Sequence, residues 1–319
     1  MHILITGSSG QIGTNLALRL LERGHAVHGV DVRANTWTSQ FPTQLQDLSL
    51  PYWRFERSIG HVEYPADLDL VVHLAAHAKV YELVEHPDRA LANVTMTYNT
   101  LEFCRHNRLP LIYSSSREVY GDVHRQRTEE TDADYRFSES PYAASKIAGE
   151  AWVYAYARCY GLRYIVFRLS NVYGRYDNDL ERMERVIPLF IRKIVAGEPV
   201  TIYGPEKLLD FTYVDDCVGG ILRGIEFLTS GKDANHTLNL AYGQGNSLVT
   251  LAEWIGESLG KVPRILLKPS REGEVTRYVA DIGAARAILG YEPTTSLREG
   301  IPKTIAWGMA WDARHRLDG

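Results

Sequence analysis

Hydrophobic and polar positions follow two alternating patterns up to about residue 175. Short apolar runs typical of buried strands are followed by longer segments in which apolar residues recur every three or four positions, as on one face of a helix. Strands that alternate with helices need crossover connections, which give a parallel sheet covered by helices on both faces. We therefore predict an α/β fold with a doubly wound parallel sheet. Strands are expected at residues 2–6, 27–30, 68–76, 109–116 and 162–174, and helices after Gly13, at 88–107 and at 141–160.

Beyond residue 175 the pattern becomes less regular. We interpret residues 1–174 as one domain and residues 175–319 mainly as a smaller C-terminal α/β lobe. The chain is expected to return to the first domain around residues 210–241. No segment rich in Pro, Gly or Ser separates the two parts, which favours a shared cleft. The elements expected in the lobe are helices at 186–197, 248–259 and 297–311 and strands at 200–204 and 237–241.

Composition and charge narrow the class of protein. Hydrophobic residues make up 45% and charged residues 23% of the 319 residues, as in ordinary globular proteins. The formal net charge is −4 and no run of Lys or Arg occurs, so we expect no nucleic-acid partner. The sequence shows neither a secretion signal nor the roughly 18 consecutive apolar residues of a membrane span. Three widely spaced cysteines fit a reducing compartment, so we expect a cytoplasmic protein without membrane contact.

The sequence TGSSGQIG places Gly7, Gly10 and Gly13 between a predicted strand and a predicted helix. Glycines in this position let the backbone approach a pyrophosphate, while the helix N-terminus offers free N–H groups and the positive end of its dipole. Asp31 ends the second strand, where a carboxylate accepts hydrogen bonds from both hydroxyls of an adenine ribose. A 2′-phosphate would meet this negative charge. We therefore predict NAD rather than NADP as the cofactor, although the nearby Arg33 weakens the preference.

A tyrosine and a lysine lie four residues apart in the sequence ESPYAASKIAGE. On a helix, Tyr142 and Lys146 would project from the same face. A nearby ammonium favours the phenolate, so Tyr142 is a candidate general base with a pKa below its reference value of about 10. Taken alone, the spacing also fits two ordinary residues on a helix surface.

Further motifs follow in a fixed order along the chain. Together with the glycine turn and the Y-x-x-x-K spacing, they resemble the extended short-chain dehydrogenase/reductase superfamily, specifically its NAD-dependent sugar-nucleotide epimerases and dehydratases. The resemblance covers nearly the whole chain, and it is specific for the superfamily rather than for one reaction. These motifs are HLAA at 73–76, Asn93, SSSREVYG at 114–121, RLSNVYG at 168–174, DFTYVDD at 210–216 and LGYEPTTSLREGI at 289–301.

The resemblance implies a Rossmann-type NAD-binding domain at residues 1–174 and a mainly substrate-binding lobe at residues 175–319. It also implies a nucleotide-sugar 4-epimerase that works through a transient 4-keto intermediate. Tyr142 would take the proton from a sugar hydroxyl, Lys146 would hold the nicotinamide ribose, and Ser116 would orient the reacting oxygen. Cofactor contacts are expected from Gly7, Gly10, Gln11, Ile12, Gly13, Asp31, Arg33, Leu74, Ala75, Ala76, Asn93, Ser114, Tyr142 and Lys146. Substrate contacts are expected from His77, Lys79, Ser116, Arg117, Asn171, Arg185, Tyr203 and Arg271.

The resemblance also implies a homodimer. The segments that correspond to residues 88–107 and 141–160 commonly pair across a two-fold axis in this superfamily. The apolar side chains expected on the shared face are those of Leu91, Leu101, Ala148 and Trp152.

The chain departs from the family pattern at two places. Leu209 replaces the arginine that commonly precedes Asp-Phe and pairs with the substrate diphosphate, so anion binding must come from elsewhere, with Arg271, Arg185 and Lys207 as candidates. The third strand of the family usually ends in an acidic stretch that contacts the adenine. In this sequence YWRFERSIG, at residues 52–60, offers Glu56 for that role, but its alignment is not secure.

Other reactions and another class of function stay open. Glu118 matches a glutamate that the decarboxylases and dehydratases of this group use, whereas Arg117 is not the acid that a 4,6-dehydratase would place there. A decarboxylase of a uronic-acid nucleotide or a dehydratase is therefore the alternative reaction, and a non-catalytic NAD-binding sensor is the alternative class. His73 and His77 have an H-x-x-x-H spacing, but at the end of a strand this spacing does not bring two imidazoles together, so we expect no metal.

Overall fold

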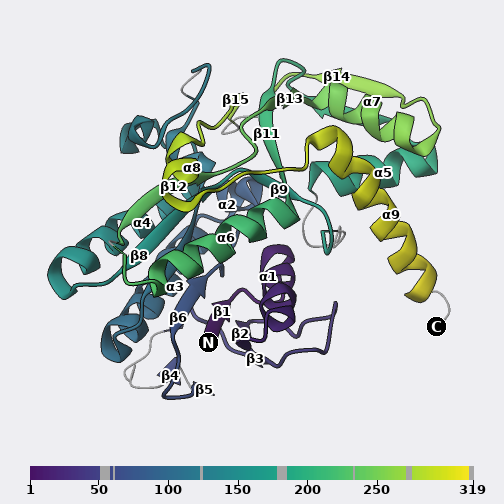
Figure 1. Ribbon diagram of the computed structural model, residues 1–319. Coiled ribbons are helices and arrows are strands. Elements are labelled where there is room, and N and C mark those ends of the chain that lie inside the picture. Colours follow the sequence, from purple (N-terminus) through teal and green to yellow (C-terminus); the bar gives the residue numbers. More distant parts are fainter. Residues whose placement is uncertain are drawn as a thin grey trace.

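A seven-stranded parallel sheet forms the centre of the molecule (Figure 1). The computed structural model describes residues 1–50, 58–59, 62–122, 125–177, 185–232, 234–270 and 275–315. The chain runs from β1 outward to β3 and then from β6 outward to the other edge, so the strand order reverses between β1 and β6. This confirms the predicted doubly wound α/β fold. In spatial order the strands are β12 (His236–Leu240), β8 (Tyr164–Leu169), β7 (Leu111–Ser116), β6 (Leu70–His73), β1 (His2–Thr6), β2 (Ala26–Asp31) and β3 (Thr43–Leu45).

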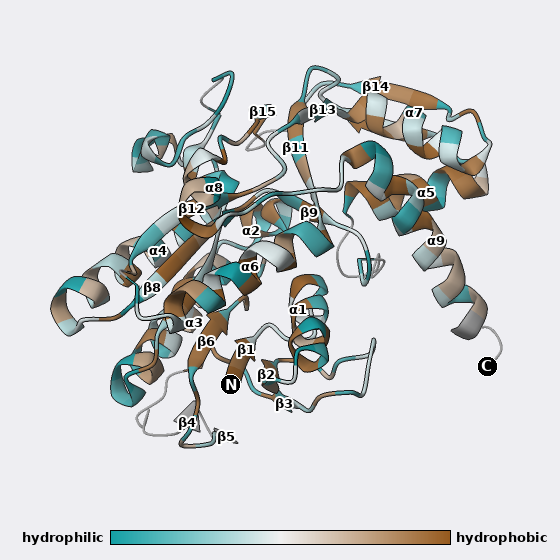
Figure 2. Cartoon of the chain, viewed as in Figure 1, coloured by the Kyte–Doolittle hydropathy of each residue, from teal (hydrophilic) through white to brown (hydrophobic). Residues whose placement is uncertain are grey.

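Helices cover both faces of this sheet, because successive side chains of a strand point to opposite faces. Ile3 and Ile5 pack on the side of α1 (Gln11–Glu22) and α6 (Val214–Thr229). Leu4, between them, packs on the side of α3 (Asp88–Asn107) and α4 (Pro141–Tyr160). The strands are therefore hydrophobic on both faces, as their mostly brown colour in Figure 2 shows.

The third strand lies earlier in the chain than predicted. β3 pairs in parallel with β2, with Gly29 opposite Thr43 and Asp31 opposite Leu45. The segment at 52–60, which could not be aligned securely with the end of this strand, comes after β3 in the chain, and Glu56 lies outside the described residues. Those residues fall partly outside the described part of the chain, and Ser58–Ile59 belongs to the separate hairpin of β4 and β5 (Val62–Glu63). β3 is only three residues long, too short to produce a visible alternation of polar and apolar positions.

The helix α6 has no counterpart in the sequence prediction. It contains Gly219, Gly220 and Gly224, and glycine weakens a helical pattern because of its low helix propensity. The structure shows why two of them are glycines. A Cβ at Gly224 would approach the Phe167 ring to 2.8 Å, and one at Gly220 would overlap the Leu240 side chain. Close packing of α6 on β8 and β12 therefore requires residues without a side chain.

The C-terminal part of the chain builds a second hydrophobic core. Two small sheets and three helices surround it, and the helix α6 leads from it back to β12 of the large sheet. None of the helices in the described residues is both long and apolar enough to cross a membrane. The remaining elements are β9 (Asn171–Tyr173), α5 (Val186–Ala196), β10 (Val200–Tyr203), β11 (Leu208–Tyr213), β13 (Gly245–Ser247), α7 (Leu248–Leu259), β14 (Ile265–Lys268), β15 (Arg277–Tyr278), α8 (Gly283–Leu289), α9 (Leu297–His315), α2 (Val80–Glu85) and the 3-10 helices η1 (Arg117–Tyr120), η2 (Glu130–Asp132) and η3 (Tyr135–Phe137).

α3 and α4 lie against each other on one side of the sheet and expose several apolar side chains. Leu91 is 71% exposed, and Trp152 meets Tyr98 of α3 edge to face with the ring centroids 5.8 Å apart. Leu101 is fully buried against the sheet, so its predicted place on an intersubunit face is wrong. A rotation of about 80° around the helix axis separates Leu101 from Leu91, so Leu101 faces the sheet while Leu91 remains exposed.

Candidate active site

The glycine turn lies between β1 and α1, at the carboxyl end of the sheet where the strand order reverses. Gly7 has a φ of +73°, and a Cβ there would lie 2.7 Å from the backbone nitrogen of Ala75. A Cβ at Gly13 would overlap the Gly7 carbonyl oxygen. Gly10 caps α1 without a side-chain hydrogen bond. The turn is thus a tight cradle at a helix N-terminus, the arrangement that receives a pyrophosphate.

Polar groups around this cradle fit a bound dinucleotide. Gln11 is the first residue of α1 and is buried, with Ile12 half-buried beside it. Within the described part of the chain, Nε2 of the Gln11 side chain has no hydrogen-bond partner. Oε1 of the same side chain accepts a hydrogen bond from Arg185. Since buried polar groups are normally paired, this free donor at the helix N-terminus fits a ligand that carries acceptor oxygens, such as NAD.

Asp31 ends β2 beside the glycine turn. One carboxylate oxygen accepts a hydrogen bond from the Ser9 amide at 3.0 Å, and the other accepts from the Arg33 amide at 3.2 Å. The Arg33 guanidinium in turn donates to the Ser9 carbonyl at 3.2 Å. A carboxylate therefore stands at the end of the second strand, held by the turn itself. Asp47 is the first acidic residue after β3, and the sequence analysis did not single it out.

The loop after β6 forms the other wall of the cradle. Leu74, Ala75 and Ala76 lead to His77, whose amide donates to the Asn93 side chain at 2.7 Å while its carbonyl accepts from Asn93 at 3.0 Å. The side chain of Asn93 thus fixes this loop from α3. Lys79 caps the start of α2.

His73 ends β6 and is buried. Burial, followed by the charge of Lys146, lowers the pKa of His73 to about 3, so the ring is neutral. One ring nitrogen pairs with the Thr6 hydroxyl at 2.7 Å. Among the described residues, no cluster of three or more His, Cys, Asp or Glu side chains could hold a metal ion.

The tyrosine–lysine pair lies in the first turns of α4, with both side chains buried. Ser140 caps the helix by accepting a hydrogen bond from the Ala143 amide at 3.1 Å. Lys146 donates from Nζ to the Ser114 carbonyl on β7 at 2.7 Å, and its Nζ lies 6.0 Å from the centroid of the Tyr142 ring. Tyr142, Lys146 and Ser116 therefore meet where β7 ends.

The predicted lowering of the Tyr142 pKa is wrong for the protein alone. Burial raises the pKa of Tyr142 to about 12, and a hydrogen bond with the Ser116 hydroxyl opposes this rise only in part. Glu118 raises the pKa further, while Arg185 and Arg117 lower it. Burial also lowers the pKa of Lys146, to about 8. Low-dielectric surroundings disfavour the charged form of both groups, and Lys146 directs its ammonium to Ser114 instead of the phenol.

Arg117 and Glu118 follow Ser116 and form an ion pair, with Arg117 Nη2 at 2.9 Å from Glu118 Oε1. The Arg117 guanidinium lies over the ring of Tyr278, 5.9 Å from its centroid. Within the described residues, the second guanidinium nitrogen, Nη1, and the second carboxylate oxygen, Oε2, are buried without a hydrogen-bond partner. Both groups thus keep hydrogen-bonding capacity beside Tyr142.

The other expected substrate residues are spread over the C-terminal part. Asn171 donates to the Asp210 carbonyl at 2.8 Å, so it fixes β11 to β9. Tyr203 ends β10, with the Lys268 ammonium 5.7 Å from its ring centroid. Lys207 is buried, and Leu209, which replaces the usual arginine, is part of the hydrophobic core. Arg271 lies outside the described residues.

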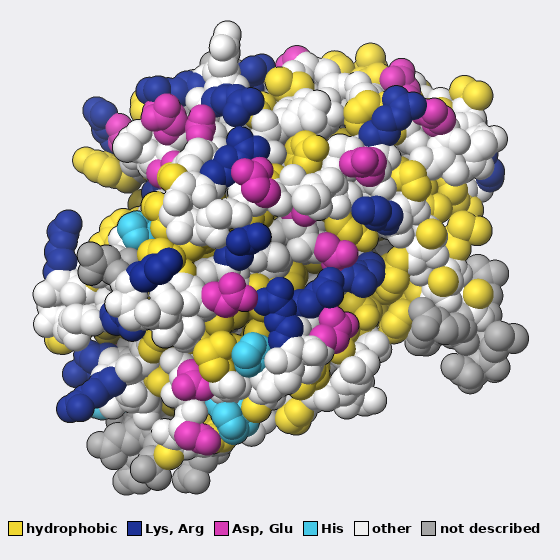
Figure 3. Space-filling model, in the orientation of Figure 1, with side chains coloured by type: hydrophobic (Ala, Val, Ile, Leu, Met, Phe, Trp, Pro, Cys, Tyr) yellow, Lys and Arg dark blue, Asp and Glu magenta, His cyan; other side chains and the backbone are white. Residues whose placement is uncertain are grey.

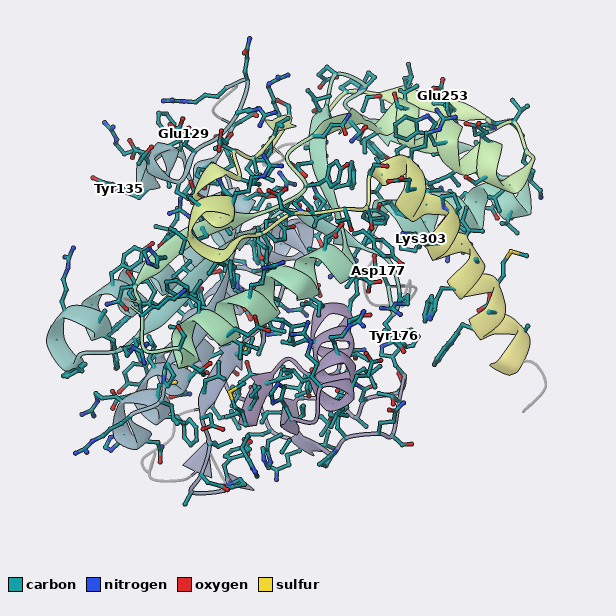
Figure 4. All side chains as sticks on the ribbon, in the orientation of Figure 1. Glu129, Tyr135, Tyr176, Asp177, Glu253 and Lys303 are labelled. Atoms are coloured by element: carbon teal, nitrogen blue, oxygen red, sulfur yellow. The ribbon has the colours of Figure 1, made fainter. Side chains whose placement is uncertain are left out.

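Arg185 lies at the cofactor cradle rather than in open solvent. It pairs with Asp177 at 3.1 Å and donates to Gln11, which is distant in sequence. Burial raises the pKa of Asp177 to about 7, while Arg185 opposes this rise. In Figure 4, Asp177 and the neighbouring Tyr176 lie beside α1, on the side that faces α9. This connection between distant segments has no local signal in the sequence.

Charges of both signs alternate over the face shown in Figure 3. Lys and Arg side chains gather near its centre, in the region of α1 and α6, with Asp and Glu among them. Arg23 of the loop after α1 pairs with Glu226 of α6 at 2.8 Å, and Arg175 pairs with Asp215. Local pairing of this kind agrees with the modest net charge of −4.

Comparisons with known proteins give a consistent result. The model of the NAD dependent epimerase/dehydratase family matches residues 3–241. UDP-glucuronate 4-epimerase 1 of Arabidopsis thaliana is 30% identical over 338 residues, which cover 98% of this chain and 77% of that protein. The crystal structure of UDP-glucose 4-epimerase from Thermotoga maritima with UDP-glucose has a TM-score of 0.85 and 29% identity, covering 98% and 99% of the two chains. The UDP-glucose 4-epimerase of Thermus thermophilus in complex with NAD has a TM-score of 0.83 and 28% identity, covering 96% and 98%.

Proposed function

Because this chain belongs to the NAD dependent epimerase/dehydratase family, we propose that Tyr142, Lys146 and Ser116 make it an NAD-dependent 4-epimerase of a nucleotide sugar. The observation that carries the proposal is the meeting of these three side chains at the end of β7, next to the glycine cradle. A non-catalytic NAD sensor has no evident use for a buried phenol, ammonium and hydroxyl in this arrangement.

Each of the three residues has a distinct task. The Tyr142 phenolate takes the proton of the C4 hydroxyl as a general base in the oxidation, and the resulting phenol gives a proton back to the C4 oxygen as a general acid in the return step. Bound NAD supplies the acceptor and later the donor of the C4 hydride. Ser116 orients the reacting oxygen, and Lys146 holds the nicotinamide ribose. Between the two steps the 4-keto sugar must rotate within the site, so that the opposite face of C4 receives the hydride.

The cradle residues hold the cofactor. The first turn of α1, with Gly7, Gly10 and Gln11, takes the pyrophosphate, and Asp31 takes the adenine ribose. A cationic nicotinamide ring beside Tyr142 would favour the phenolate and so reduce the rise in pKa that burial causes.

The substrate carrier is a nucleoside diphosphate, and UDP is the first candidate because UDP-glucose occupies the Thermotoga structure. The C-terminal elements around α5, β10 and α7 would bind the nucleotide. Since Leu209 provides no charge, the diphosphate needs a cation from another position, and Lys207 and Arg271 remain the candidates.

Glu118 favours a second candidate reaction. Its carboxylate is buried beside Tyr142, and one of its oxygens has no partner within the described part of the chain. A carboxylate in this place could move a proton after C4 oxidation, as a dehydratase requires. If the substrate is a uronic acid, its 4-keto form would lose carbon dioxide readily, which makes the alternative a decarboxylase. The products of dehydration and of decarboxylation differ in mass from the substrate, whereas an epimer does not.

The protein is proposed to act as a homodimer. α3 and α4 together expose Leu91, Tyr98, Trp152 and Tyr160 on one side of the sheet. An apolar surface of this kind on two adjacent helices suits a self-complementary contact across a two-fold axis.

A panel of UDP-, GDP-, CDP- and dTDP-sugars tests the proposed function. Purified protein with NAD is incubated with each sugar nucleotide, and products are analysed by mass spectrometry and NMR. A product of unchanged mass with inverted C4 supports epimerisation, whereas loss of water or of carbon dioxide identifies the second candidate reaction. If the protein binds NAD but forms no product from any sugar in the panel, epimerisation and the alternative reaction are both contradicted.

A further inference from the structure

Glu150 lies one turn after Lys146 on α4, and both side chains are on the buried face of the helix. The proposed reaction does not use Glu150, yet its carboxylate is buried next to residues on which that reaction depends.

The Glu150 carboxylate uses both oxygens in hydrogen bonds to three elements. Oε1 accepts from the Ser115 hydroxyl at 2.6 Å and from Arg168 Nε at 2.9 Å. Oε2 accepts from Arg168 Nη2 at 2.7 Å and from the Tyr154 hydroxyl at 3.0 Å. Arg168 belongs to β8 and Ser115 to β7, so this one carboxylate joins α4 to two strands of the sheet.

Three consecutive serines on β7 connect this network to the active site. The Ser114 carbonyl accepts from Lys146, the Ser115 hydroxyl donates to Glu150, and the Ser116 side chain faces Tyr142. A displacement of Glu150 would therefore be transmitted to the ammonium through the helix and to the serines through the strand.

Stability alone does not explain a buried ion pair. Removing two charges from water is costly, and apolar residues of similar volume often stabilise a protein equally well or better. The Glu150–Arg168 pair is almost completely buried, with both side chains 6% exposed. The desolvation cost of the pair is explained if the negative charge of Glu150 has an effect on Lys146.

We propose that Glu150 is a positioning residue that fixes Lys146 against the serines of β7 and keeps its ammonium charged at the pH at which the enzyme works. The catalytic meaning of this inference rests on the proposed function.

The other side chains that the structure describes around the Lys146 ammonium are uncharged, so Glu150 is the negative charge that acts on it. From β7, the Tyr113 ring lies 5.2 Å from Nζ, and from α4 itself the Tyr142 ring lies 6.0 Å away. From β6, His73 is neutral, because burial lowers its pKa. Among the described residues, Glu150 is the group whose charge raises the pKa of Lys146 against the larger effect of burial.

The direction of each charge effect follows from electrostatics. Replacing Glu150 by glutamine removes the attraction and leaves the Arg168 cation, so the pKa of Lys146 should fall further below its present value of about 8. Replacing Arg168 by glutamine leaves the carboxylate less neutralised, so the pKa of Lys146 should rise. A purely structural role of the pair predicts no shift in either variant.

The experiment is a titration of Lys146 by NMR in protein labelled with 13C at the lysine Cε atoms. Lys146→Arg identifies the resonance by its loss. Glu102→Gln is the matched control, because Glu102 also combines an arginine at 2.7 Å with a tyrosine of α4 but acts on neither Lys146 nor the serines. Thermal unfolding of each variant reports any general loss of stability.

Expected is a downward shift of the Lys146 pKa by about one unit or more in Glu150→Gln. An upward shift is expected in Arg168→Gln and no shift in Glu102→Gln. If Glu150→Gln does not fold, the direction in which the Lys146 pKa moves in Arg168→Gln tests the proposal by itself. An unmoved Lys146 pKa in a folded variant of the pair overturns the proposal. The titration needs no substrate, so it remains readable if the sugar panel yields no product, and where a product forms, the alkaline limb of activity should move with the pKa.

Discussion

The Tyr142 hydroxyl is expected to be needed for the chemical step but not for NAD binding. Tyr142→Phe should lower turnover by at least a hundredfold, since general acid–base groups typically contribute 10²–10⁴-fold. NAD affinity should stay close to that of the unchanged protein, because the ring remains in place. Turnover of the preferred sugar nucleotide and calorimetric NAD binding measure the two quantities.

Tyr135→Phe is the control for this substitution, because Tyr135 is exposed on η3. Near-normal turnover in Tyr142→Phe would remove the phenol from the mechanism and leave the tyrosine–lysine pair as two buried helix residues.

The protonation of Lys146 should govern how NAD binding depends on pH. Burial gives Lys146 a pKa of about 8, so the ammonium is charged below that pH and neutral above it. If the ammonium holds the ribose, NAD affinity should be constant up to about pH 7 and should weaken as the pH rises through 8. Calorimetry from pH 6 to pH 10 measures this, and in Lys146→Met the weakening should disappear. An affinity independent of pH in the unchanged protein would argue against a ribose contact.

Asp31 should set the preference for NAD. In Asp31→Ala, the charge-assisted hydrogen bonds to the ribose hydroxyls are lost, and NAD binding should weaken by about 1–3 kcal/mol. NADP binding should weaken less or improve, because the carboxylate no longer repels the 2′-phosphate. Asp67→Ala, at a largely exposed position, is the control. Tighter binding of NADP than of NAD to the unchanged protein would contradict the assignment.

Residues with a local signature could be identified from the sequence, and residues paired over long distances could not. Gly7, Gly10 and Gly13 are recognisable because a strand and a helix flank them directly. Tyr142 and Lys146 are recognisable because the helical repeat puts them on one face and the other motifs of the family accompany them along the chain. The contact of Arg185 with Gln11 depends on how distant segments fold together, and the pKa of Tyr142 depends on burial, which no spacing reveals.

At the scale of elements, α4 must approach the sheet closely to bring Lys146 to β7. A Cβ at Gly149 would overlap the Tyr113 hydroxyl, so Gly149→Ala should push the helix away from the strand. We expect a loss of stability of about 1–3 kcal/mol, typical of overpacking, together with reduced turnover. Urea unfolding and the epimerase assay measure these effects.

Gly219→Ala provides the control within another helix. No neighbour lies within 4 Å of a Cβ at Gly219, so alanine should stabilise α6 by about 0.5–1 kcal/mol through its higher helix propensity. Equal effects of the two substitutions would show that close packing of α4 is not what Gly149 provides.

Long helices between clear apolar strands were predictable, and short or glycine-rich elements were not. α3 and α4 occupy the predicted ranges, because the apolar strands before and after each helix mark where it begins and ends. β3 has three residues and exposes Leu45, so its pattern resembles a loop. α6 contains glycines that only the packing against Phe167 and Leu240 explains.

At the scale of the whole molecule, the exposed apolar side chains of α3 and α4 predict a dimer. Light scattering at micromolar concentration should return twice the chain mass of 36.0 kDa. Leu91→Glu places a charge in the proposed contact without disturbing the core, because Leu91 is 71% exposed, and it should yield the monomer. Val262→Glu, at a position 95% exposed elsewhere, should leave the dimer intact. A single chain mass for the unchanged protein would contradict the dimer.

The pairing of β12 with β8 has a consequence for how the protein is made. β8 is buried along its whole length, and the strand that covers its outer edge ends only at Leu240. A ribosome that has completed β8 must still produce the C-terminal elements β9 to β11 and the helix α6 before that edge is closed. During this interval the nascent chain presents an apolar strand with free backbone groups, to which other unfinished chains can add. Productive synthesis should therefore depend on chaperones that shield the growing chain until β12 pairs with β8.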